Sequence, residues 1–269
     1  MTKIKNNCIL ITGGASGIGR IMGRMALEKG ARQLVIWDIN QANIEATEKE
    51  FACLGNVKGY KIDVSDNDAV VKTFAQTVEE CGNVDILINC AGIITSNRHF
   101  AEMTQAEIDR TMAINASAPM SIALQALPPM LERNFGHICN IASAAGFIAN
   151  PKMSVYAASK WAVIGWSDSL RVELQEAKSN VHVTTIAPYY INTGMFDGVR
   201  SRIIPILKPE WVAKKILKAI EKNKKISSWP LGYHLIRTLQ AVFTLRGLDL
   251  LCKVLGIYSA LDHFKGKKN

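Results

Sequence analysis

Short apolar runs alternate along the chain with longer stretches in which apolar residues recur every three or four positions. The short runs predict β-strands and the longer stretches predict amphipathic helices. The expected strands span 8–12, 33–37, 57–62, 84–89, 137–141 and 181–186, and the expected helices span 19–29, 41–53, 67–80, 104–132 and 154–177. Strands that are apolar on both faces require helices on both sides of a parallel sheet. The sequence therefore predicts an α/β fold with a doubly wound sheet, in which ligands bind at the carboxyl ends of the strands.

A glycine-rich segment, Thr12 to Gly19, follows the first predicted strand and opens the first predicted helix. Glycine lets the backbone turn tightly and approach a phosphate closely, and a helix N-terminus offers free N–H groups to an anion. Asp38 ends the second strand, near the distance from the turn that is expected of a ribose-binding carboxylate. Together they predict a dinucleotide site, although a carboxylate placed like Asp38 can also cap a helix.

Asp38 also bears on which dinucleotide binds. Its carboxylate can accept hydrogen bonds from two ribose hydroxyls of NAD, whereas it would repel the 2′-phosphate of NADP. The next residues, Ile39 and Asn40, supply no arginine to bind that phosphate. The sequence therefore predicts NAD in preference to NADP.

Tyr156 and Lys160 lie four positions apart in a predicted helix and therefore share a face. A nearby ammonium favours the phenolate form of tyrosine, which makes Tyr156 a candidate general acid and base. Such a pair is common by chance and needs partners. Ser143 follows a strand and can donate a hydrogen bond to a reacting oxygen. Asn115 lies inside the helical stretch 104–132, and its backbone carbonyl at a kink could hold a water that passes protons to Lys160.

With these residues the sequence resembles the short-chain dehydrogenase/reductase family over residues 7–229. The resemblance rests on the glycine-rich segment, on Asn89-Cys90-Ala91-Gly92, and on Tyr156 and Lys160 with Ser143 13 residues before the tyrosine. It implies a Rossmann-type fold and a homo-oligomer, either a dimer or a tetramer. The catalytic residues it implies are Asn115, Ser143, Tyr156 and Lys160. The cofactor-binding residues it implies are Gly13, Ser16, Gly17, Ile18, Gly19, Asp38, Ile39, Asp63, Val64, Asn89, Ala91, Gly92, Tyr156, Lys160, Ile191 and Thr193.

The resemblance also assigns contacts and shows departures from the family pattern. Asp63 and Val64 would contact adenine, Asn89, Ala91 and Gly92 would lie beside the adenosine ribose, and Ile191 and Thr193 would contact the nicotinamide carboxamide. Cys90 replaces an asparagine of the motif, a change expected on the sheet interior. Tyr189 replaces a glycine after Pro188, and Tyr189 and Tyr190 could shape an apolar substrate site.

The segment Pro188–Asp197 and the ending Leu261–Lys268 are similar to the group that contains epidermal retinol dehydrogenase and related hydroxysteroid dehydrogenases. This similarity implies a lipophilic alcohol or ketone of the retinol, steroid or fatty alcohol class as the substrate. Residues 225–229 resemble the last strand of the family. We therefore expect a catalytic domain over 1–229 and a helical C-terminal extension of the same domain over 230–269.

The formal net charge of +9 is unevenly divided along the chain. Residues 1–199 carry 17 lysines and arginines against 19 acidic residues, whereas residues 200–269 carry 15 against 4. No nucleic-acid reading module accompanies this basic end, so nucleic acid is not expected as a partner. An anionic membrane surface reached through 230–269 and a simply solvated basic surface both remain open.

The remaining composition bears on compartment and metal. The six cysteines lack metal or disulfide spacing, which indicates buried thiols in a reducing compartment. The first residues lack the apolar segment of a signal peptide or an N-terminal anchor, so we expect a cytoplasmic protein that is not secreted and lies, if at all, peripherally on a membrane. The histidines show no ligand spacing, so no metal is expected.

The motifs predict an enzyme that transfers hydride between a nicotinamide and an alcohol or carbonyl. Two alternatives remain at this point. A 3-oxoacyl-thioester reductase would use the same residues and suit a basic surface, but Asp38 argues against its usual NADP. A nonenzymatic NAD-binding scaffold would need none of the catalytic residues.

Overall fold

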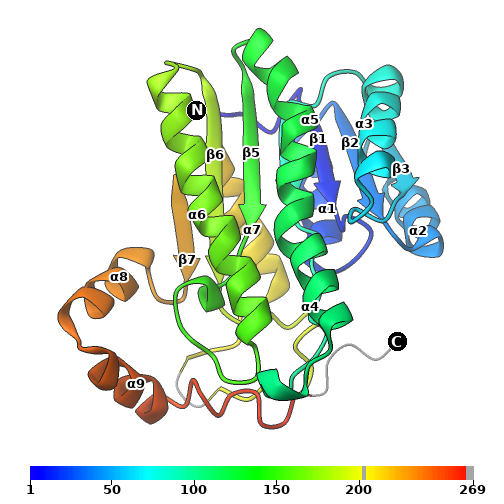
Figure 1. The fold of residues 1–269 in the computed structure, drawn as a ribbon. Helices are drawn as coiled ribbons and strands as arrows, with labels where there is room; N and C mark the ends of the chain where they lie inside the picture. Colours follow the sequence, from blue (N-terminus) through cyan, green and yellow to red (C-terminus); the bar gives the residue numbers. More distant parts are fainter. Residues whose placement is uncertain (202–203, 265–269) are drawn as a thin grey trace.

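A parallel sheet of seven strands runs through the middle of the molecule, in a computed structural model that describes residues 1–201 and 204–264 (Figure 1). The strands lie in the order β3-β2-β1-β4-β5-β6-β7. Their bounds are β1 (Cys8–Thr12), β2 (Gln33–Asp38), β3 (Val57–Lys61), β4 (Ile86–Asn89), β5 (Gly136–Ile141), β6 (Val181–Pro188) and β7 (Ile226–Trp229). The predicted doubly wound α/β fold is confirmed.

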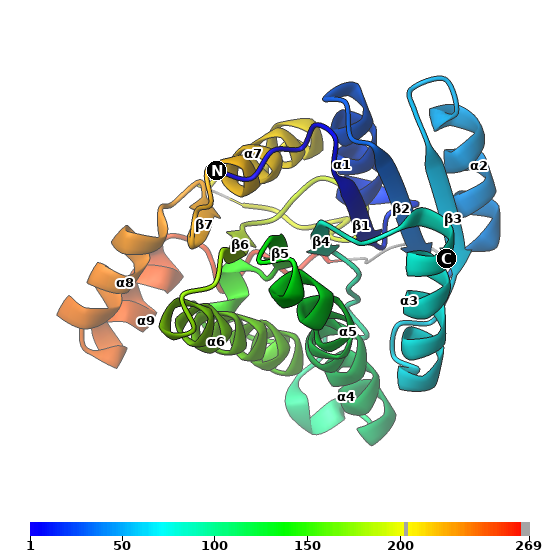
Figure 2. The same ribbon diagram turned by 90° about the horizontal axis from the view of Figure 1, so that it is seen from above.

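Helices cover both faces of the sheet (Figure 2). One face carries α1 (Gly17–Glu28), α2 (Gln41–Phe51) and α7 (Pro209–Glu221), and the other carries α3 (Asn67–Cys81), α4 (Gln105–Met112), α5 (Ala118–Glu132) and α6 (Ser154–Glu176). Alternate residues of β1 supply the two cores, since Ile9 and Ile11 pack with α1 and α7 whereas Cys8 and Leu10 pack with α3 and α5. This double burial explains why the strands are apolar throughout.

The order of the strands reverses between β1 and β4. The chain leaves β1 for α1 on one face of the sheet and leaves β4 for α4 and α5 on the other. The two connections therefore diverge and leave a crevice at the carboxyl ends of these neighbouring strands. The residues that follow β1, β4, β5 and β6 all reach this edge of the sheet.

The helical stretch predicted over 104–132 is confirmed, and it contains an irregular turn at Asn115. The stretch divides into α4, a π-helical turn (Ala113–Ser117) and α5. Within this turn the N–H of Ala118 bonds to the carbonyl of Ala113, five residues back. One wide turn does not disturb the apolar period enough to be visible in the sequence, but such turns often mark functional sites in helices.

The C-terminal segment forms the predicted helical extension. β7 is followed by α8 (Tyr233–Val242) and α9 (Leu245–Val254), and residues 255–264 then cross beneath the carboxyl ends of the strands (Figure 1). This last stretch consists of turns rather than helix. Ala260 and Leu261 are buried there in a cluster with Tyr156 and Tyr190. Three lysines of the predicted basic ending, Lys265, Lys267 and Lys268, lie outside the described residues.

The six cysteines are all free thiols, but not all are buried as predicted. Cys8, Cys139 and Cys252 are buried, whereas Cys53 is exposed at the end of α2 and Cys81 and Cys90 are half-buried. A scattered spacing cannot reveal which side of a helix a thiol occupies, and this accounts for the error. Among the described residues, no three His, Cys, Asp or Glu side chains cluster to hold a metal ion.

A buried histidine joins the N-terminus to the amino end of the sheet. The ring of His137 contacts the hydroxyls of Thr2 (Nδ1 to Oγ1, 3.0 Å) and Thr184 (Nε2 to Oγ1, 2.8 Å). Burial lowers the pKa of His137 from 6.5 to about 3, with a smaller contribution from His182. The unfolded chain therefore binds a proton below pH 6.5 that the folded protein takes up only near pH 3.

We expect this histidine to make the fold less stable in mild acid. Its contribution to the free energy of unfolding is complete above pH 6.5 and is lost as the pH falls. The free energy of unfolding should decrease by about 2 kcal/mol between pH 7 and pH 5 because of this residue. Urea denaturation of the wild type and of His137→Gln at both pH values measures the effect, because contributions from other groups appear in both proteins. Equal losses in the two proteins would contradict the assignment.

Candidate active site

The glycine-rich turn lies at one end of the crevice and depends on its missing side chains. Gly13 has a φ of +65°, and a Cβ there would lie 3.0 Å from the Cα of Ala91. A Cβ on Gly19 would lie 2.2 Å from the carbonyl oxygen of Gly13. Ser16 precedes α1 and makes no side-chain hydrogen bond to its first turn, and the residues of that turn line the crevice. This geometry fits a pyrophosphate.

Asp38 supports the same turn from the end of β2. Its Oδ2 accepts from the N–H of Ala15 (3.1 Å), and its Oδ1 accepts from the N–H of Asn40 (3.1 Å). Helix α2 is capped by Asn40, whose Oδ1 accepts from the N–H of Asn43, so Asp38 does not serve as its cap. Each carboxylate oxygen retains an acceptor position for a further donor.

A cavity of about 270 Å³ extends from the glycine-rich turn to Tyr156. Most of the predicted residues line it: Gly13, Ser16, Gly17, Ile18, Gly19, Ala91, Gly92, Ser143, Tyr156, Lys160, Ile191 and Thr193. Six predicted residues do not line it: Asp38, Ile39, Asp63, Val64, Asn89 and Asn115. Residues that the sequence analysis did not assign to the cofactor site also line it: Cys90, Ile141, Ala142, Pro188, Tyr189, Met195 and Phe196.

Tyr156, Lys160 and Ser143 meet at the far end of this cavity. The first turns of α6 place Tyr156 and Lys160 on one face, and the ammonium nitrogen lies 5.6 Å from the centre of the phenol ring. Lys160 Nζ donates to the carbonyl of Ile141 at the end of β5 (3.1 Å). The side chain of Ser143 hydrogen-bonds the Tyr156 hydroxyl. The phenol, the serine hydroxyl and the ammonium therefore border one space.

Burial controls the protonation of this pair. It raises the pKa of Tyr156 to about 12, and the hydrogen bond from Ser143 offsets only part of the rise. Burial also lowers the pKa of Lys160 to about 8. In this structure burial outweighs the stabilisation of the phenolate that Lys160 was expected to supply, and that role of the lysine stays a prediction. The phenol carries its proton at neutral pH.

Asn115 lies in the π-helical turn and holds the loop that follows β4. Its Oδ1 accepts from the N–H of Ile93 (2.8 Å), and its Nδ2 donates to the carbonyl of the same residue (2.9 Å) and to the hydroxyl of Ser159 (3.3 Å). A Cβ on Gly92 would lie 3.3 Å from this Oδ1 and 3.5 Å from Lys160 Nζ. The amide of Asn115 thus positions the cavity wall next to the lysine.

Asn89 faces the interior rather than the cavity. Its Nδ2 donates to Asn140 Oδ1 (2.9 Å) and to the carbonyl of Pro119 (3.3 Å), and so joins β4 to β5 and α5. Cys90, which was expected on the sheet interior, is half-buried and lines the cavity instead. Burial raises the pKa of its thiol to about 12, so the sulfur beside Lys160 stays protonated.

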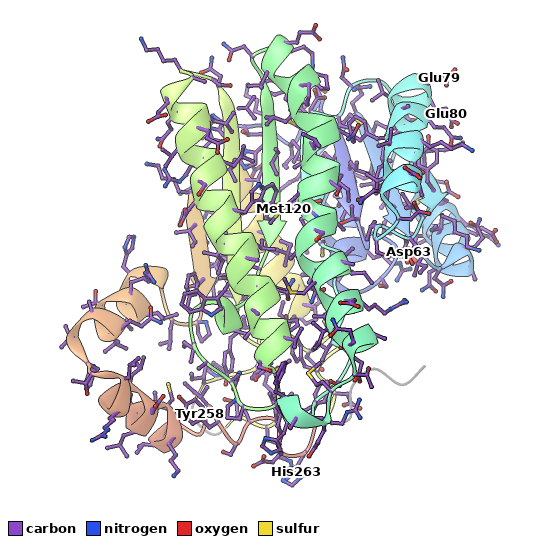
Figure 3. The ribbon with its side chains drawn as sticks, in the orientation of Figure 1. Asp63, Glu79, Glu80, Met120, Tyr258 and His263 are labelled. Atoms are coloured by element: carbon purple, nitrogen blue, oxygen red, sulfur yellow. The ribbon has the colours of Figure 1, made fainter. Side chains whose placement is uncertain are left out.

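The two residues predicted at the adenine follow β3. Asp63 lies near the start of α3 (Figure 3). Its carboxylate accepts from the N–H (3.0 Å) and hydroxyl (2.6 Å) of Ser65, bonds that lower its pKa. Val64 is buried in the core beneath α3. Their assigned contacts with adenine stay predictions, as does that of Asn89 with the ribose.

A cluster of aromatic rings closes the cavity on the side away from the glycine-rich turn. Phe196 packs edge-on against Tyr156 and Tyr190, with ring centres 6.3 and 4.9 Å apart. A second space of about 20 Å³ lies between Ser143, Tyr156, Tyr190, Phe196 and Ile257, and we call it the inner cavity. Phe196 lies in a segment without helical or strand periodicity, so no sequence signal pointed to it.

The comparisons with known proteins agree with this geometry. A family model described as short chain dehydrogenase matches residues 7–203. Epidermal retinol dehydrogenase 2 of Mus musculus is 31% identical, with 98% of this chain and 87% of that protein covered. Estradiol 17-beta-dehydrogenase 11 of Rattus norvegicus is 32% identical, with 98% and 89% covered.

A solved structure shares the fold. The short chain dehydrogenase/reductase from Burkholderia phymatum in complex with NAD has a TM-score of 0.79 and 24% identity, with 94% of this chain and 97% of that chain covered. The family model matches most of the chain, and the two relatives are more than 30% identical to it. Together they establish the family of this protein. The chain belongs to the short-chain dehydrogenase/reductase family and is an oxidoreductase that uses a nicotinamide cofactor.

Proposed function

We propose that this protein interconverts a lipophilic alcohol and its carbonyl compound with NAD as the hydride carrier. The observation that carries the proposal is the convergence of Tyr156, Ser143 and Lys160 at the end of a cavity whose other end is the glycine-rich turn. The relatives named retinol and estradiol dehydrogenases act on alcohols of this class. The apolar lining around Phe196 and Tyr190 suits such a molecule.

The roles of the side chains follow from their positions and protonation. Ser143 and Tyr156 hydrogen-bond the substrate oxygen, and the nicotinamide, when bound, accepts or supplies the hydride. In reduction the protonated phenol donates its proton to the developing alkoxide, which suits its pKa of about 12. In oxidation the phenol must first lose that proton, and the charge of Lys160 favours this loss. The side-chain amide of Asn115 acts by holding the Ile93 loop. The water on its backbone carbonyl remains a prediction.

Asp38 supports NAD as the preferred cofactor. Its carboxylate stands beside the glycine-rich turn through its bond to Ala15, with acceptor positions still available. A 2′-phosphate next to this carboxylate would be repelled, and Ile39 and Asn40 offer no positive charge.

A substrate panel tests the proposed function. Retinol, hydroxysteroids and long-chain alcohols are assayed with NAD, next to 3-oxoacyl thioesters with NADH and NADPH. We expect turnover with at least one lipophilic alcohol and none with the thioesters. The absence of turnover in every assay, from protein that binds NAD, would instead support a scaffold.

We also propose that the protein is a homo-oligomer. Leu124, Leu131 and Val172 are exposed on the neighbouring helices α5 and α6, where a second copy could cover them. Exposed apolar side chains gathered on one surface are typical of association sites.

The same reasoning extends to α8 and α9, for which we propose contact with an anionic membrane. Helix α8 buries Ile236, whereas Leu235 and Val242 are exposed, and Leu245, Leu250 and Val254 are exposed on α9. Arg237, Arg246 and Lys253 are exposed among them. An apolar surface flanked by cations fits anionic headgroups over acyl chains. No helix in the described parts of the chain is long and apolar enough to span a membrane.

We expect the full chain to float with liposomes that contain anionic lipid at low salt. Val242 and Leu245, 73% and 82% exposed, are the last residue of α8 and the first residue of α9 and can be changed without opening the core. The liposome partition coefficient of the double variant Val242→Ser/Leu245→Ser should be at least about tenfold lower than that of the wild type. Val71→Ser/Leu54→Ser, on the opposite part of the surface, is the matched control. Equal flotation of the two variants would contradict a membrane contact at α8 and α9.

A further inference from the structure

The inner cavity is too small for the alcohol that the proposed function requires. Its volume of about 20 Å³ accommodates roughly one water molecule. Ile257 lines this space together with Tyr156, and Ala260 and Leu261 pack in the adjoining aromatic cluster. A lipophilic substrate must therefore place most of its length elsewhere, and one that passes through the inner cavity must displace Ile257.

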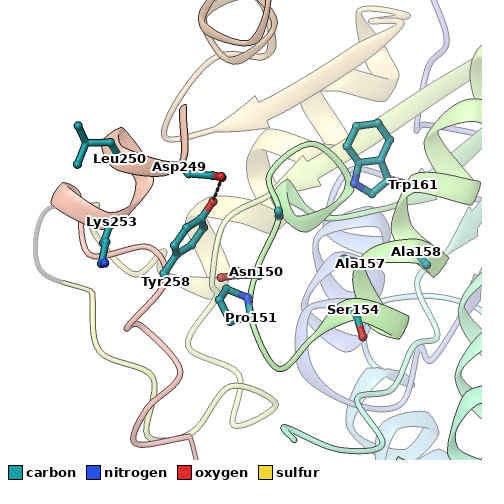
Figure 4. A pocket seen from close by; sticks show the side chains of 11 residues that line it. Asn150, Pro151, Ser154, Ala157, Ala158, Trp161, Asp249, Leu250, Lys253 and Tyr258 are labelled. Atoms are coloured by element: carbon teal, nitrogen blue, oxygen red, sulfur yellow. Dashed lines mark hydrogen bonds between the residues drawn. The ribbon is translucent and has the colours of Figure 1, made fainter. Parts of the chain in front are cut away.

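A larger apolar groove lies directly behind this wall. It has a volume of about 900 Å³ and runs between the loop 149–151, the first turns of α6, and α9 with Tyr258 (Figure 4). Trp161 and Leu250 are 46% and 63% exposed along it, although both are large and apolar. Lys253 and Asp249 are the charged residues that border it, and the carboxylate of Asp249 accepts from the Tyr258 hydroxyl (2.5 Å). We call it the outer groove.

The wall between the inner cavity and the outer groove is one residue thick. Asn150 lines both spaces. In three places neighbours in the chain point to opposite sides, since Met153, Tyr156 and Ile257 line the inner cavity and Ser154, Ala157 and Tyr258 line the groove. Two of these pairs lie at the N-terminal end of α6, but the third lies in the turns that follow α9.

That third part of the wall has few polar ties to the rest of the protein. Residues 260–262 are held by the N–H of Arg200 on the carbonyl of Ala260 (3.0 Å), by Asn97 Nδ2 on the carbonyl of Leu261 (3.0 Å), and by the Lys152–Asp262 ion pair (3.4 Å). Ile257 and Tyr258 form hydrogen bonds within the same segment: the Tyr258 hydroxyl donates to Asp249, the Ile257 N–H donates to the carbonyl of Cys252, and the Ile257 carbonyl accepts from the N–H of Ala260 (3.3 Å). Apolar packing of Ile257 with Ile204 and Cys252 holds this part of the wall in place.

We infer that the outer groove binds the hydrocarbon chain of the substrate alcohol. This hydrocarbon chain passes from the reaction site to the groove between Asn150 and the Ile257–Tyr258 segment. The inference rests on the proposed oxidation of a lipophilic alcohol. It adds that this alcohol carries its hydroxyl group at the end of a long apolar chain. The hydroxyl lies between Ser143 and Tyr156. The chain displaces Ile257 and lies over Ala157, Ala158 and Trp161, where it covers apolar surface that is otherwise exposed to water.

The first test is a series of primary alcohols, hexanol, decanol and hexadecanol, assayed with NAD. Burial of each further methylene in the groove should raise kcat/KM by about two- to fourfold until the groove is filled. Ala158→Trp fills the groove from the exposed side of α6 and should lower the ratio of kcat/KM for hexadecanol to that for hexanol at least about tenfold. Ser169→Trp, on the exposed surface of the same helix but outside the groove, is the matched control and should keep the wild-type ratio.

The second test does not depend on turnover. A long-chain alcohol with a nitroxide at its far end should quench the emission of Trp161, measured as the difference between the wild type and Trp161→Phe. Quenching without oxidation of any alcohol would support the groove and contradict the proposed function. Oxidation that is independent of chain length, without quenching, would overturn the groove and leave the function intact. A change of oligomeric state in Ala158→Trp with an unchanged ratio would overturn it in favour of a second copy on this surface.

Discussion

Replacement of Tyr156 by phenylalanine is expected to lower kcat by roughly a hundredfold or more, while NAD affinity changes by no more than a few-fold. The change removes one hydroxyl that hydrogen-bonds Ser143 and that lies where the substrate oxygen reacts. Loss of a positioned general acid or base carries an effect of this size. The ring remains, so its edge contact with Phe196 and its place in the buried cluster are preserved. Steady-state kinetics at saturating cofactor, with NAD titrated separately, measures both quantities.

Lys160→Ala should behave differently and lower both turnover and cofactor affinity. The ammonium donates to the carbonyl of Ile141 and borders both Gly92 and the phenol, so its loss disturbs the cavity as well as the proton-transfer group. Ser169→Ala on the same helix serves as a control that leaves both values unchanged. Near-normal kcat in the phenylalanine variant would remove Tyr156 from the mechanism.

The sequence was sufficient where function depends on local motifs. The glycine-rich turn needs no long-range information, because backbone geometry dictates glycine at Gly13 and Gly19. Tyr156 and Lys160 are brought together by one turn of helix, and Ser143 by the end of an apolar strand. The strand and helix pattern likewise follows from apolar periodicity, which is why the order of elements agreed with prediction.

The sequence was insufficient where tertiary packing decides. Asn89 points to Asn140 because β4 and β5 pair in that register, and a motif cannot reveal the side on which an amide lies. The pKa of Tyr156 depends on burial, which reverses the effect expected from a nearby cation. Phe196 reaches Tyr156 from 40 residues away through an irregular loop. Ile257 reaches the inner cavity from the C-terminal turns, which the sequence analysis assigned to helix.

Replacement of Asp38 by alanine is expected to weaken the binding of NAD and to narrow the proposed preference for NAD over NADP. The variant removes the acceptor proposed for the ribose hydroxyls and the charge that repels a 2′-phosphate. A charge-assisted hydrogen bond contributes about 1.5–3 kcal/mol, so kcat/KM for NAD should fall roughly ten- to a hundredfold. The value for NADP should fall less or rise.

Asp38 also supports the turn, and this structural role must be separated from recognition. Alanine leaves the N–H groups of Ala15 and Asn40 without their partner, so some loss with both cofactors could come from a distorted turn. Asp38→Asn is the sharper variant, because its amide oxygen can still accept from Ala15 while the negative charge is gone. If charge decides the preference, the asparagine variant gains activity with NADP while the fold, followed by thermal unfolding, stays intact. A wild type that already prefers NADP would show that Asp38 only supports the turn.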